Sequence, residues 1–340
     1  MKKRKYNIKN IVILITIIIL STILAGALLA NVYVDSLLSR MNQTKRVDDS
    51  QLAIDETVKE QKKAYKVVNF ALFGTDNDGN KTDTDRSDAI KVISLNYDLK
   101  NISITSLQRD MMIVLADESN DFDKINHAYW YGGANLAMAT INYNFDLDIN
   151  RYVTLSFSSL EKIVDIVGGV EIELSGPEAG WIHMGSGNQT LSGKKALEYA
   201  RIRKIDSDYS RMDRQTKVII AVINKIKSKN VLEILDIVNK VLPYVETNLS
   251  TNEIKDYLTD ILSFNLTNIN QYHVPNDDFN DTNSRTYKGY NPVYQLRSYE
   301  EQVKKIHKDI YGIDDYHVSQ NVVTNEQRII DTFGEFVSPN

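Results

Sequence analysis

Hydrophobic positions along the chain alternate between the spacings typical of strands and those typical of helices. Short apolar, β-branched runs predict strands, and apolar residues three or four positions apart predict helices. The predicted strands are Val67–Phe73, Ala89–Asn96, Ile102–Leu107, Tyr152–Phe157, Val170–Leu174 and a piece near 268–274. The predicted helices cover 132–143, 158–168, 192–200, 211–228, 231–240, 251–263 and 298–310. This alternation predicts an α/β domain with its elements packed in layers.

Some helix ends have recognisable residues. Ser158, followed three positions later by Glu161, has the pattern of a capping box, and Gly168-Gly169 has that of a helix end. Ser192 is placed to cap the helix that follows it. These signals fix where the predicted elements should begin and end.

The N-terminus combines a basic segment with a long uncharged one. Five Lys and Arg side chains between residues 2 and 9 precede the uncharged run 11–30. About 20 helical residues span the roughly 30 Å of a bilayer core, and a basic flank stays on the cytoplasmic side. We therefore predict a cytoplasmic tail at 1–10 and a single-pass anchor at 11–30, with the rest of the chain outside the cell. Small residues at Ala25, Ala27 and Ala30 leave a cleaved signal peptide as the alternative.

Composition divides the remainder of the chain into three parts. Residues 31–65 are polar and contain neither Gly nor Pro, so they are expected to form a helical stalk or a flexible tether. Residues 66–315 carry the strand and helix patterns and form the predicted domain. Residues 316–340 are polar and are expected to be a loose C-terminal tail.

Charge and cysteine content exclude several functions. The chain has no cysteine, which excludes disulfides, zinc–thiolate sites and cysteine nucleophiles. Its formal net charge is -5, so bulk attraction to nucleic acid is not expected. An anion site would have to come from a local cluster of arginines and lysines.

An acidic cluster follows the first predicted strand. Asp76, Asp78, Asp83, Asp85 and Asp88 lie within the segment 74–88. Carboxylates so close together suit a hard cation, although their spacing does not match an EF-hand loop. If the two flanking strands are neighbours, the carboxylates at the end of one and the start of the next converge. A solvated acidic loop is the alternative interpretation.

Arginines form a second cluster near the middle of the chain. Arg201 and Arg203 share a face if their segment is extended, and Arg211, Arg214 and Gln215 have the spacing of one helical face. The guanidinium group suits bidentate contacts with phosphate. Two further members are Arg109 and, if the acidic loop folds toward them, Arg86. Surface arginines in ordinary ion pairs are the alternative. A metal site beside such arginines is what phosphoryl or pyrophosphate chemistry requires.

Many short segments resemble the LytR-CpsA-Psr wall-polymer ligases, in order, from about residue 69 to 217. The segments are Asn69–Asp76, Asp85–Asp88, Arg109–Asp110, Asp123–Asn126, Ala128–Tyr129, Tyr131–Gly133, Val164–Asp165, Gly168–Val170, Leu191–Gly193, Ala196–Leu197, Tyr199–Arg203, Asp208–Arg211 and Arg214–Gln215. The resemblance implies a layered αβα domain around a mixed central sheet, behind one transmembrane helix. It also implies an apolar pocket for a polyprenyl chain with a pyrophosphate-binding mouth.

The resemblance implies roles for particular residues. Asp76 and Asp88 would hold Mg²⁺ (or Mn²⁺). The catalytic set would be Asp88, Arg86, Arg109, Arg201 and Arg203, and the pyrophosphate ligands would be Arg86, Arg109, Arg201, Arg203, Arg211, Arg214 and Gln215. The implied enzyme is a Gram-positive membrane phosphotransferase. It would move an anionic glycopolymer (teichoic acid, capsule or another wall polysaccharide) from undecaprenyl pyrophosphate to peptidoglycan as a phosphodiester, releasing undecaprenyl phosphate. Its partners would be that lipid-linked polymer, the peptidoglycan acceptor and membrane lipid, and no nucleic acid.

The chain departs from the family pattern at two positions. Gln108 stands where proline usually precedes the Arg-Asp pair, and His127 stands where a small residue is common. We interpret His127 as local packing. The general base is open between Asp88 and Asp110. The aromatic residues 129–131 either stack on sugars or fill the core.

Two other functions stay under consideration. One is a membrane-bound transcription regulator, which the absence of a helix-turn-helix pattern and the short cytoplasmic tail oppose. The other is a glycan-binding protein or a hydrolase that releases the polymer to water.

Overall fold

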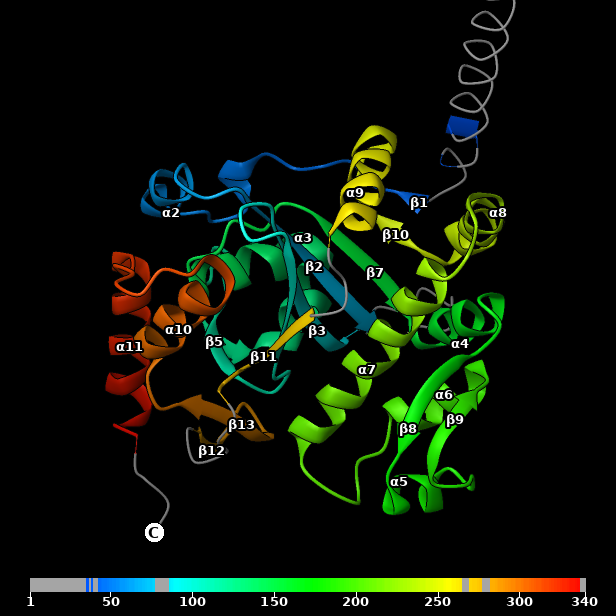
Figure 1. Ribbon diagram of the computed structural model, residues 1–340. Coiled ribbons are helices and arrows are strands. Elements are labelled where there is room, and N and C mark those ends of the chain that lie inside the picture. The colour runs from blue at the N-terminus through cyan, green and yellow to red at the C-terminus, as the bar shows by residue number, and fades with distance from the viewer. Residues whose placement is uncertain are drawn as a thin grey trace, which may run out of the picture.

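The computed structural model describes residues 35, 36, 38, 42–76, 86–264, 269–276 and 282–336. Its central sheet has seven strands in the order β1-β10-β7-β2-β3-β4-β11 (Figure 1). Their bounds in that order are Asn42–Gln43, Glu246–Thr247, Tyr152–Ser156, Val67–Thr75, Ser87–Asn96, Asn101–Leu107 and Ile269–Val274. The pairs β1–β10, β2–β7 and β4–β11 are parallel and the other neighbours are antiparallel. The predicted mixed sheet is therefore confirmed.

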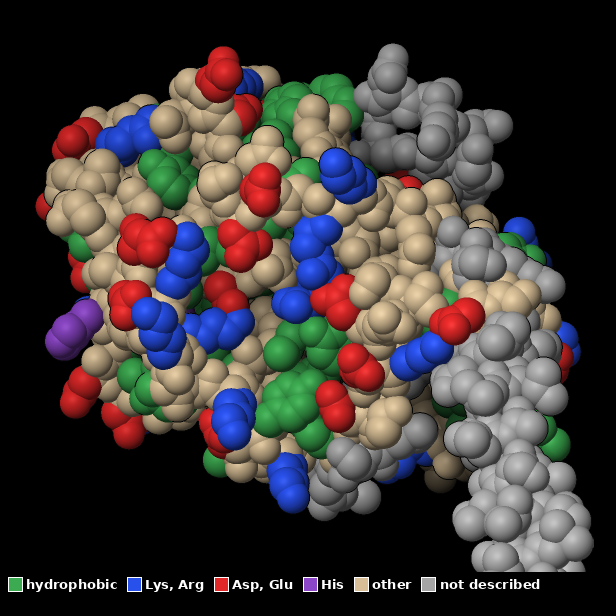
Figure 2. All heavy atoms as spheres, turned by 90° about the horizontal axis from the view of Figure 1, so that it is seen from above, with side chains coloured by type: hydrophobic (Ala, Val, Ile, Leu, Met, Phe, Trp, Pro, Cys, Tyr) green, Lys and Arg blue, Asp and Glu red, His purple; other side chains and the backbone are tan. Residues whose placement is uncertain are grey.

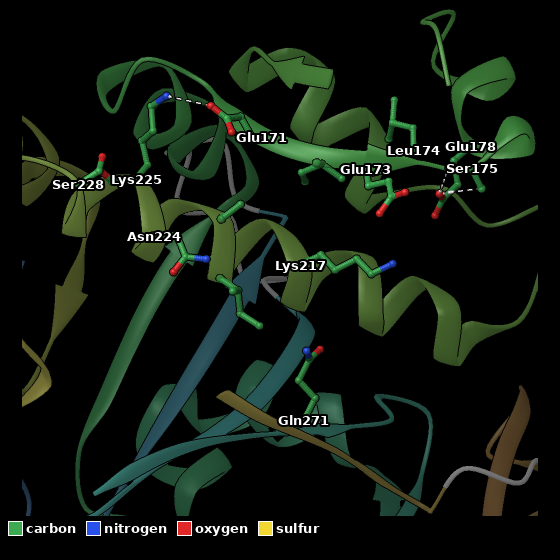
Figure 3. A pocket seen from close by; sticks show the side chains of 13 residues that line it. Glu171, Glu173, Leu174, Ser175, Glu178, Lys217, Asn224, Lys225, Ser228 and Gln271 are labelled. Atoms are coloured by element: carbon green, nitrogen blue, oxygen red, sulfur yellow. Dashed lines mark hydrogen bonds and ion pairs between the residues drawn. The ribbon is translucent and has the colours of Figure 1, made fainter. Parts of the chain in front are cut away.

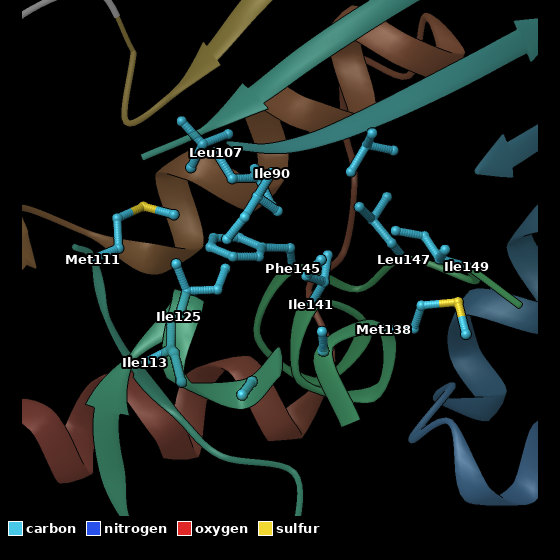
Figure 4. Close-up of a cluster of buried hydrophobic side chains, with 14 of the residues drawn as sticks. Ile90, Leu107, Met111, Ile113, Ile125, Met138, Ile141, Phe145, Leu147 and Ile149 are labelled. Carbon is cyan, nitrogen blue, oxygen red and sulfur yellow. The ribbon is translucent and has the colours of Figure 1, made fainter. Parts of the chain in front are cut away.

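Helices cover both faces of this sheet. On one face lie α3 (Ile125–Phe145), α10 (Tyr299–Tyr311) and α11 (Gln320–Phe333), which bury the main core together with β2 and β3. Figure 4 shows part of that core, where Ile90 and Leu107 of the sheet meet Ile141 and Phe145 of α3. On the other face lie α7 (Asp208–Lys227) and α9 (Thr251–Ser263), and a smaller core forms there. The arrangement is the predicted αβα layering.

Smaller units surround the sheet. Two hairpins, β5 (Met112–Val114) with β6 (Phe122–Lys124) and β12 (Thr282–Tyr287) with β13 (Tyr290–Leu296), lie near α3 and α10. A third hairpin, β8 with β9, packs with several short helices around its own buried cluster. The elements of that third unit are α4 (Phe157–Ile166), β8 (Val170–Leu174), α5 (Gly176–Trp181), β9 (Gly187–Leu191), α6 (Gly193–Ala200) and α8 (Val231–Val241).

Two predicted helix starts need correction. Helix α4 begins at Phe157 and its N-cap is Ser156, whose Oγ accepts a hydrogen bond of 3.0 Å from the Ser159 N–H, so Ser158 forms no capping box. Helix α3 begins at Ile125, and Gly132 and Gly133 interrupt it. Gly133 has a φ of +62°, a conformation that side chains with a Cβ rarely adopt. The predicted cap at Ser192 is confirmed, because its side chain accepts from the Lys195 N–H.

The predicted stalk at 31–65 is wrong for residues 42–65, which belong to the folded domain. Strand β1 pairs with β10 at the edge of the sheet. Helix α2 (Glu56–Lys62) buries Val58, and Leu52 just before it lies in the main core. Arg46 adds an ion pair of 2.8 Å with Glu253 of α9. Pairing of β1 in the sheet and burial of apolar side chains hold this segment in the domain. Without them, its backbone hydrogen-bonding groups and apolar surface would be exposed to water.

The predicted loose tail at 316–340 is wrong for most of its length. Helix α11 packs on α3 and α10 and buries Val322 and Ile329. Ser319 caps it and also donates a hydrogen bond of 2.6 Å to Asp146. This segment therefore extends the layer of helices on the α3 face.

The described residues contain no helix that is both long and apolar enough to cross a bilayer. The predicted tail at 1–10 and anchor at 11–30 lie outside the described residues. Viewed from the end that carries α2 and α9, acidic and basic side chains are interspersed around patches of apolar ones (Figure 2). No continuous basic area is visible among the described residues on that face.

Candidate active site

Two carboxylates meet where β2 ends and β3 begins. These strands are antiparallel neighbours, and Thr75 is paired with Ser87. Asp76 and Asp88 follow these two positions and face each other across the end of the sheet. Burial, and then the charge and hydrogen bond of Asp88, raise the pKa of Asp76. The predicted convergence of the two carboxylates is thus present. Asp78, Asp83 and Asp85 lie outside the described residues.

Three of the predicted arginines hold these carboxylates. Arg201 donates to Asp76 Oδ1 over 3.0 Å, and Arg203 lies 3.6 Å from Asp88 Oδ2. Arg109, at the end of β4, donates to Asp88 Oδ1 over 2.6 Å. Arg201 is the C-cap of α6, and its guanidinium lies 4.5 Å from the centre of the Phe157 ring. Chain turns at the ends of strands and of a helix therefore bring charges of both signs together.

A cavity of about 290 Å³ opens between these side chains. Arg211 and Gln215, one turn apart on α7, form part of its wall, as their spacing predicted. Arg211 is buried and paired with Asp208 over 2.6 Å. The lining residues are Asp76, Asp88, Phe157, Ala200, Arg201, Arg203, Arg211 and Gln215. We refer to this space as the polar cavity. Its cations are suited to binding a pyrophosphate group.

Arg214, which was predicted among the pyrophosphate ligands, does not line the polar cavity. Its side chain is 1% exposed and donates to both oxygens of Asp206, over 2.6 and 2.8 Å. It also donates to the Ile202 carbonyl over 2.9 Å. Arg214 therefore holds the loop that carries Arg203 against α7.

Arg86 lies at the edge of the site and does not line the polar cavity. Its guanidinium is 4.8 Å from the centre of the Trp130 ring and 5.8 Å from that of Tyr290. These distances are typical of cation–π contacts. Arg86 is two residues from Asp88, so it is adjacent to the site but faces the α3 side.

A second, apolar cavity of about 330 Å³ lies on the α7 face of the sheet. It continues the line of the polar cavity along α7, because Ile219 and Ile223 follow Arg211 and Gln215 at successive turns. Its lining residues are Phe70, Ala71, Leu72, Ile93, Leu95, Val153, Leu155, Leu160, Ile163, Ile219, Val222, Ile223, Leu249, Ile254 and Tyr257. We refer to it as the apolar cavity. Such a space accepts a hydrocarbon chain at little cost.

Lys91 lies between α7 and the sheet and was not anticipated from the sequence. It is 1% exposed, and its ammonium group donates to Ser106 Oγ, Thr216 Oγ1 and the Met212 carbonyl over 2.7, 2.8 and 3.2 Å. Burial lowers the pKa of Lys91 to about 7. On β3, Lys91 shares a face with Ile93 and Leu95, so it faces α7 between the two cavities.

The turn after β4 holds Asp110 in place. Asp110 accepts hydrogen bonds from Lys124 over 2.7 Å and Arg109 over 3.2 Å. Burial favours a higher pKa for Asp110, but these two cations outweigh it and lower the pKa. A carboxylate held in this way is a poor general base. Gln108, in place of the usual proline, accepts a hydrogen bond of 2.6 Å from the Asp110 N–H.

A larger cavity, of about 750 Å³, lies between α7 and β8 and contains none of the predicted site residues (Figure 3). Glu171, Glu173 and Glu178 face it from one side, and Lys217 and Lys225 from α7. Glu171 and Lys225 are 3.8 Å apart, so opposite charges partly neutralise each other. Volume alone therefore does not identify the site.

A Mg²⁺ ion usually takes one or two protein carboxylates and completes its shell with water and phosphate oxygens. Among the described residues, no group of three or more acidic, His or Cys side chains could enclose a metal. Asp76 and Asp88 form a pair of the kind that Mg²⁺ uses, and burial together with the neighbouring charge of Asp88 raises the pKa of Asp76. The donor set fits a cation that shares its ligands with a phosphate substrate.

The fold agrees with the comparison to known proteins. The family model described as the LytR_cpsA_psr family matches residues 31–308, and the chain belongs to this family. A relative from Enterococcus faecalis, the polyisoprenyl-teichoic acid–peptidoglycan teichoic acid transferase TagU, is 34% identical over 220 residues, covering 61% of this chain and 72% of the relative. The enzyme of the same name from Bacillus cereus (strain AH820) is 32% identical over 246 residues, covering 70% and 78%.

Solved structures share the fold. The crystal structure of Bacillus subtilis TagV aligns with a TM-score of 0.61 at 23% identity, covering 75% of this chain and 99% of that one. A LytR-CPS2A-psr family protein, YwtF (TagT), with bound octaprenyl pyrophosphate lipid aligns with a TM-score of 0.55 at 23% identity, covering 73% and 91%. The mixed α/β architecture is therefore that of the family.

Proposed function

We propose that this protein transfers an anionic glycopolymer from an undecaprenyl-pyrophosphate carrier to peptidoglycan. The polymer is a teichoic acid, a capsule or another secondary wall polysaccharide. The observation that carries this proposal is that two cavities follow one another along one face of α7. One is lined by arginines and paired carboxylates and the next by apolar side chains, which matches a ligand with a pyrophosphate head and a hydrocarbon tail. The names of the TagU relatives support the same substrate class.

In this proposal the described arginines have two roles, binding of the pyrophosphate and positioning of Asp88. Arg201, Arg203, Arg211 and Gln215 bind the pyrophosphate from the walls of the polar cavity. Arg109 fixes Asp88 at 2.6 Å, so that carboxylate is held in one orientation. Side chains preorganised in this way stabilise charge that develops on phosphate oxygens without rearranging during the reaction.

We further propose that Asp76 and Asp88 hold Mg²⁺, or Mn²⁺, together with the substrate. When bound, the ion neutralises charge on the pyrophosphate oxygens and on the phosphate that leaves. Arg201 and Arg203, which pair with the same two carboxylates, are then free to turn toward the phosphates. The acidic pair thus serves as a ligand set rather than as a proton acceptor.

The chemical step exchanges the phosphoanhydride bond of the pyrophosphate for a phosphate ester bond to the glycan. A sugar hydroxyl of the peptidoglycan glycan attacks the phosphorus next to the polymer, and a new P–O bond forms. The bond from that phosphorus to the bridging oxygen breaks, and its electron pair leaves on undecaprenyl phosphate. The hydroxyl proton is released to water. The product is a phosphodiester that links polymer to wall.

We also propose that residues 11–30 anchor the chain in the cell membrane, with residues 1–10 inside and the domain outside. The lipid-linked donor and the wall acceptor are both available on that side. The apolar run with its basic flank supports this orientation.

The test uses the full chain in liposomes with a synthetic polyprenyl-pyrophosphate-linked polymer and soluble peptidoglycan strands. We expect Mg²⁺-dependent release of polyprenyl phosphate together with polymer attached to glycan. Asp88→Asn and Arg203→Ala should lower the rate at least about 100-fold, as removal of a charge-stabilising group does. Arg328→Ala, on α11, is the matched control and should keep the activity.

Two results would overturn parts of the proposal. Free polymer ending in phosphate, with none on the glycan, would make the protein a hydrolase. Full activity of Asp88→Asn would remove the site assignment while leaving the reaction class open to another site.

A further inference from the structure

Two adjacent aromatic rings form an exposed surface on the α3 side of the site. Trp130 and Tyr131 are stacked, with ring centres 5.2 Å apart and planes 21° from parallel. The Tyr131 side chain is among the most exposed large hydrophobic groups of the described residues, at 48%. We refer to this pair as the aromatic shelf. Tyr129, by contrast, packs on Phe73 in the core, with ring centres 5.2 Å apart.

The shelf is held rigidly from below. The Tyr131 hydroxyl donates to Asp123 Oδ2 over 2.7 Å, and His127 Nδ1 lies 2.7 Å from Asp123 Oδ1. His127 is buried and meets both shelf rings edge-on, at 5.6 and 6.1 Å. Gly133 interrupts α3 directly after the shelf, so the two rings sit on a separate helical turn. The exposed Tyr131 ring, kept in one orientation by the Trp130 ring stacked against it, is suited to stacking on a flat ligand face.

Arg86 connects the shelf to the reacting groups. Its guanidinium lies 4.8 Å from the Trp130 ring centre, and two peptide units span at most about 7 Å between Arg86 and Asp88. Lys124, at the end of β6, pairs with Asp110 next to Arg109 and lies 5.7 Å from the Tyr290 ring. The shelf is therefore connected to Asp88 of the polar cavity through Arg86, two residues away.

The position of the shelf relative to the lipid decides which substrate it serves. The apolar cavity lies on the α7 face of the sheet, whereas the shelf belongs to α3 on the opposite face. In a displacement at phosphorus, the attacking and leaving oxygens lie on opposite sides of the phosphorus atom. Polyprenyl phosphate leaves toward the α7 face, so the attacking hydroxyl has to approach from the α3 side.

We propose that the aromatic shelf binds a pyranose ring of the acceptor glycan and so presents its hydroxyl to the phosphorus. This inference rests on the proposed transferase function. The C–H face of a pyranose is apolar and its rim carries hydroxyls, which matches an exposed aromatic ring with the Arg86 guanidinium nearby. Tyr and Trp suit such a ligand because they offer a large flat surface at a low cost in side-chain entropy.

The first experiment measures binding without catalysis. The chain has two tryptophans, so Trp181→Phe leaves Trp130 as the only indole. Titration of this full-length variant with an N-acetylglucosamine oligosaccharide should change the Trp130 emission and saturate. Adding Tyr131→Ala to the same background should weaken the response about five-fold, the order expected for one stacked ring.

The second experiment separates acceptor binding from the chemistry. In the liposome assay, Trp130→Ala/Tyr131→Ala should raise the KM for the soluble glycan at least about five-fold. Release of polyprenyl phosphate to water without acceptor should be unchanged, as should binding of the lipid donor. Trp181→Ala removes an aromatic side chain of similar exposure, 44%, far along the chain on α5 and should leave all three unchanged. If the double variant does not fold, Tyr131→Ala alone carries the comparison.

The outcomes separate the two proposals. An unchanged glycan KM with no response of Trp130 to the oligosaccharide would overturn the shelf and leave the transferase intact. A saturable Trp130 response in a chain that transfers nothing would keep the shelf as a glycan site and overturn the transferase. A loss of donor binding in the double variant would also count against the shelf as an acceptor site.

Discussion

Arg214 of α7 and Asp206 of the preceding loop are joined by two hydrogen bonds, of 2.6 and 2.8 Å. Arg214→Ala removes the guanidinium and leaves the carboxylates of Asp206 and Glu178 without this partner, so it should lower the free energy of unfolding by about 3 kcal/mol. The value is at the low end for a buried pair because the Asp206 side chain is one-third exposed, at 33%. Arg203→Ala, whose side chain is 52% exposed, should change the stability by less than about 1 kcal/mol and abolish transfer. Urea unfolding of both variants distinguishes them; equal losses of stability would contradict these roles.

The facing carboxylates predict how stability depends on pH and Mg²⁺. The pKa of Asp76 is raised, so between its ordinary value of 3.8 and the raised value the folded chain binds more protons than the unfolded one. Stability should therefore fall as pH rises through this interval. At pH 7, Mg²⁺ at ten times its dissociation constant should restore about 1.4 kcal/mol. Thermal unfolding with and without Mg²⁺ measures this. Asp88→Asn should lose the Mg²⁺ shift and show a smaller pH effect, because burial of Asp76 remains the largest cause of its raised pKa. A Mg²⁺ shift that survives in this variant would place the ion elsewhere.

Buried Lys91 predicts a stability change of the opposite sign with pH. Its pKa is lowered from 10.5 to about 7, so above pH 7 the unfolded chain binds more protons and this contribution to stability increases up to about pH 10. Each ten-fold change in the proton affinity of the amine corresponds to about 1.4 kcal/mol. Lys91→Met should therefore be more stable than the parent near pH 6, with an advantage that shrinks toward pH 10. Unfolding series at the two pH values test this; a constant difference would show that Lys91 stays charged in the fold.

The two faces of α7 allow a matched test of the apolar cavity. Val222 lines that cavity, and its neighbour Ile220 lines the larger cavity beside β8. Val222→Trp fills space needed by the polyprenyl chain and should weaken lipid-donor binding about ten-fold. Ile220→Trp adds the same bulk on the other side and should have no effect. Binding of inorganic pyrophosphate provides the control for the polar cavity and should be equal in both variants. Equal losses of lipid binding would mean that the tail takes another path.

Local patterns in the sequence predicted those parts of the site that local geometry determines. Asp76 and Asp88 converge because their strands are consecutive and antiparallel, so one short connection determines their proximity. Arg211 and Gln215 share a wall because helical spacing places them one turn apart. The six predicted strands are present, as β2, β3, β4, β7, β8 and β11, because buried β-branched runs have few alternatives.

Where distant segments decide the environment, the sequence was less informative. Arg214 has the helical spacing of Arg211 and Gln215, but it forms an ion pair with Asp206 instead of lining the polar cavity. Helical spacing does not indicate which carboxylate lies near a given arginine. An alternating strand pattern would predict that Lys91 is exposed to solvent. In the fold, however, α7 covers it. Leu52 and Val58 are isolated apolar residues in a charged segment, so their burial depends on contacts far along the chain.

The pairing of β1 with β10 has a mechanical consequence for an anchored chain. If residues 11–30 anchor the chain as proposed, force from the membrane would reach Asn42 and Gln43 at the edge of the sheet, where backbone hydrogen bonds share the load. The domain cannot swing outward without first peeling off this strand and pulling Leu52 from the interior. A fragment that starts at Val67 would therefore lack both this edge strand and the Leu52 side chain of the main core.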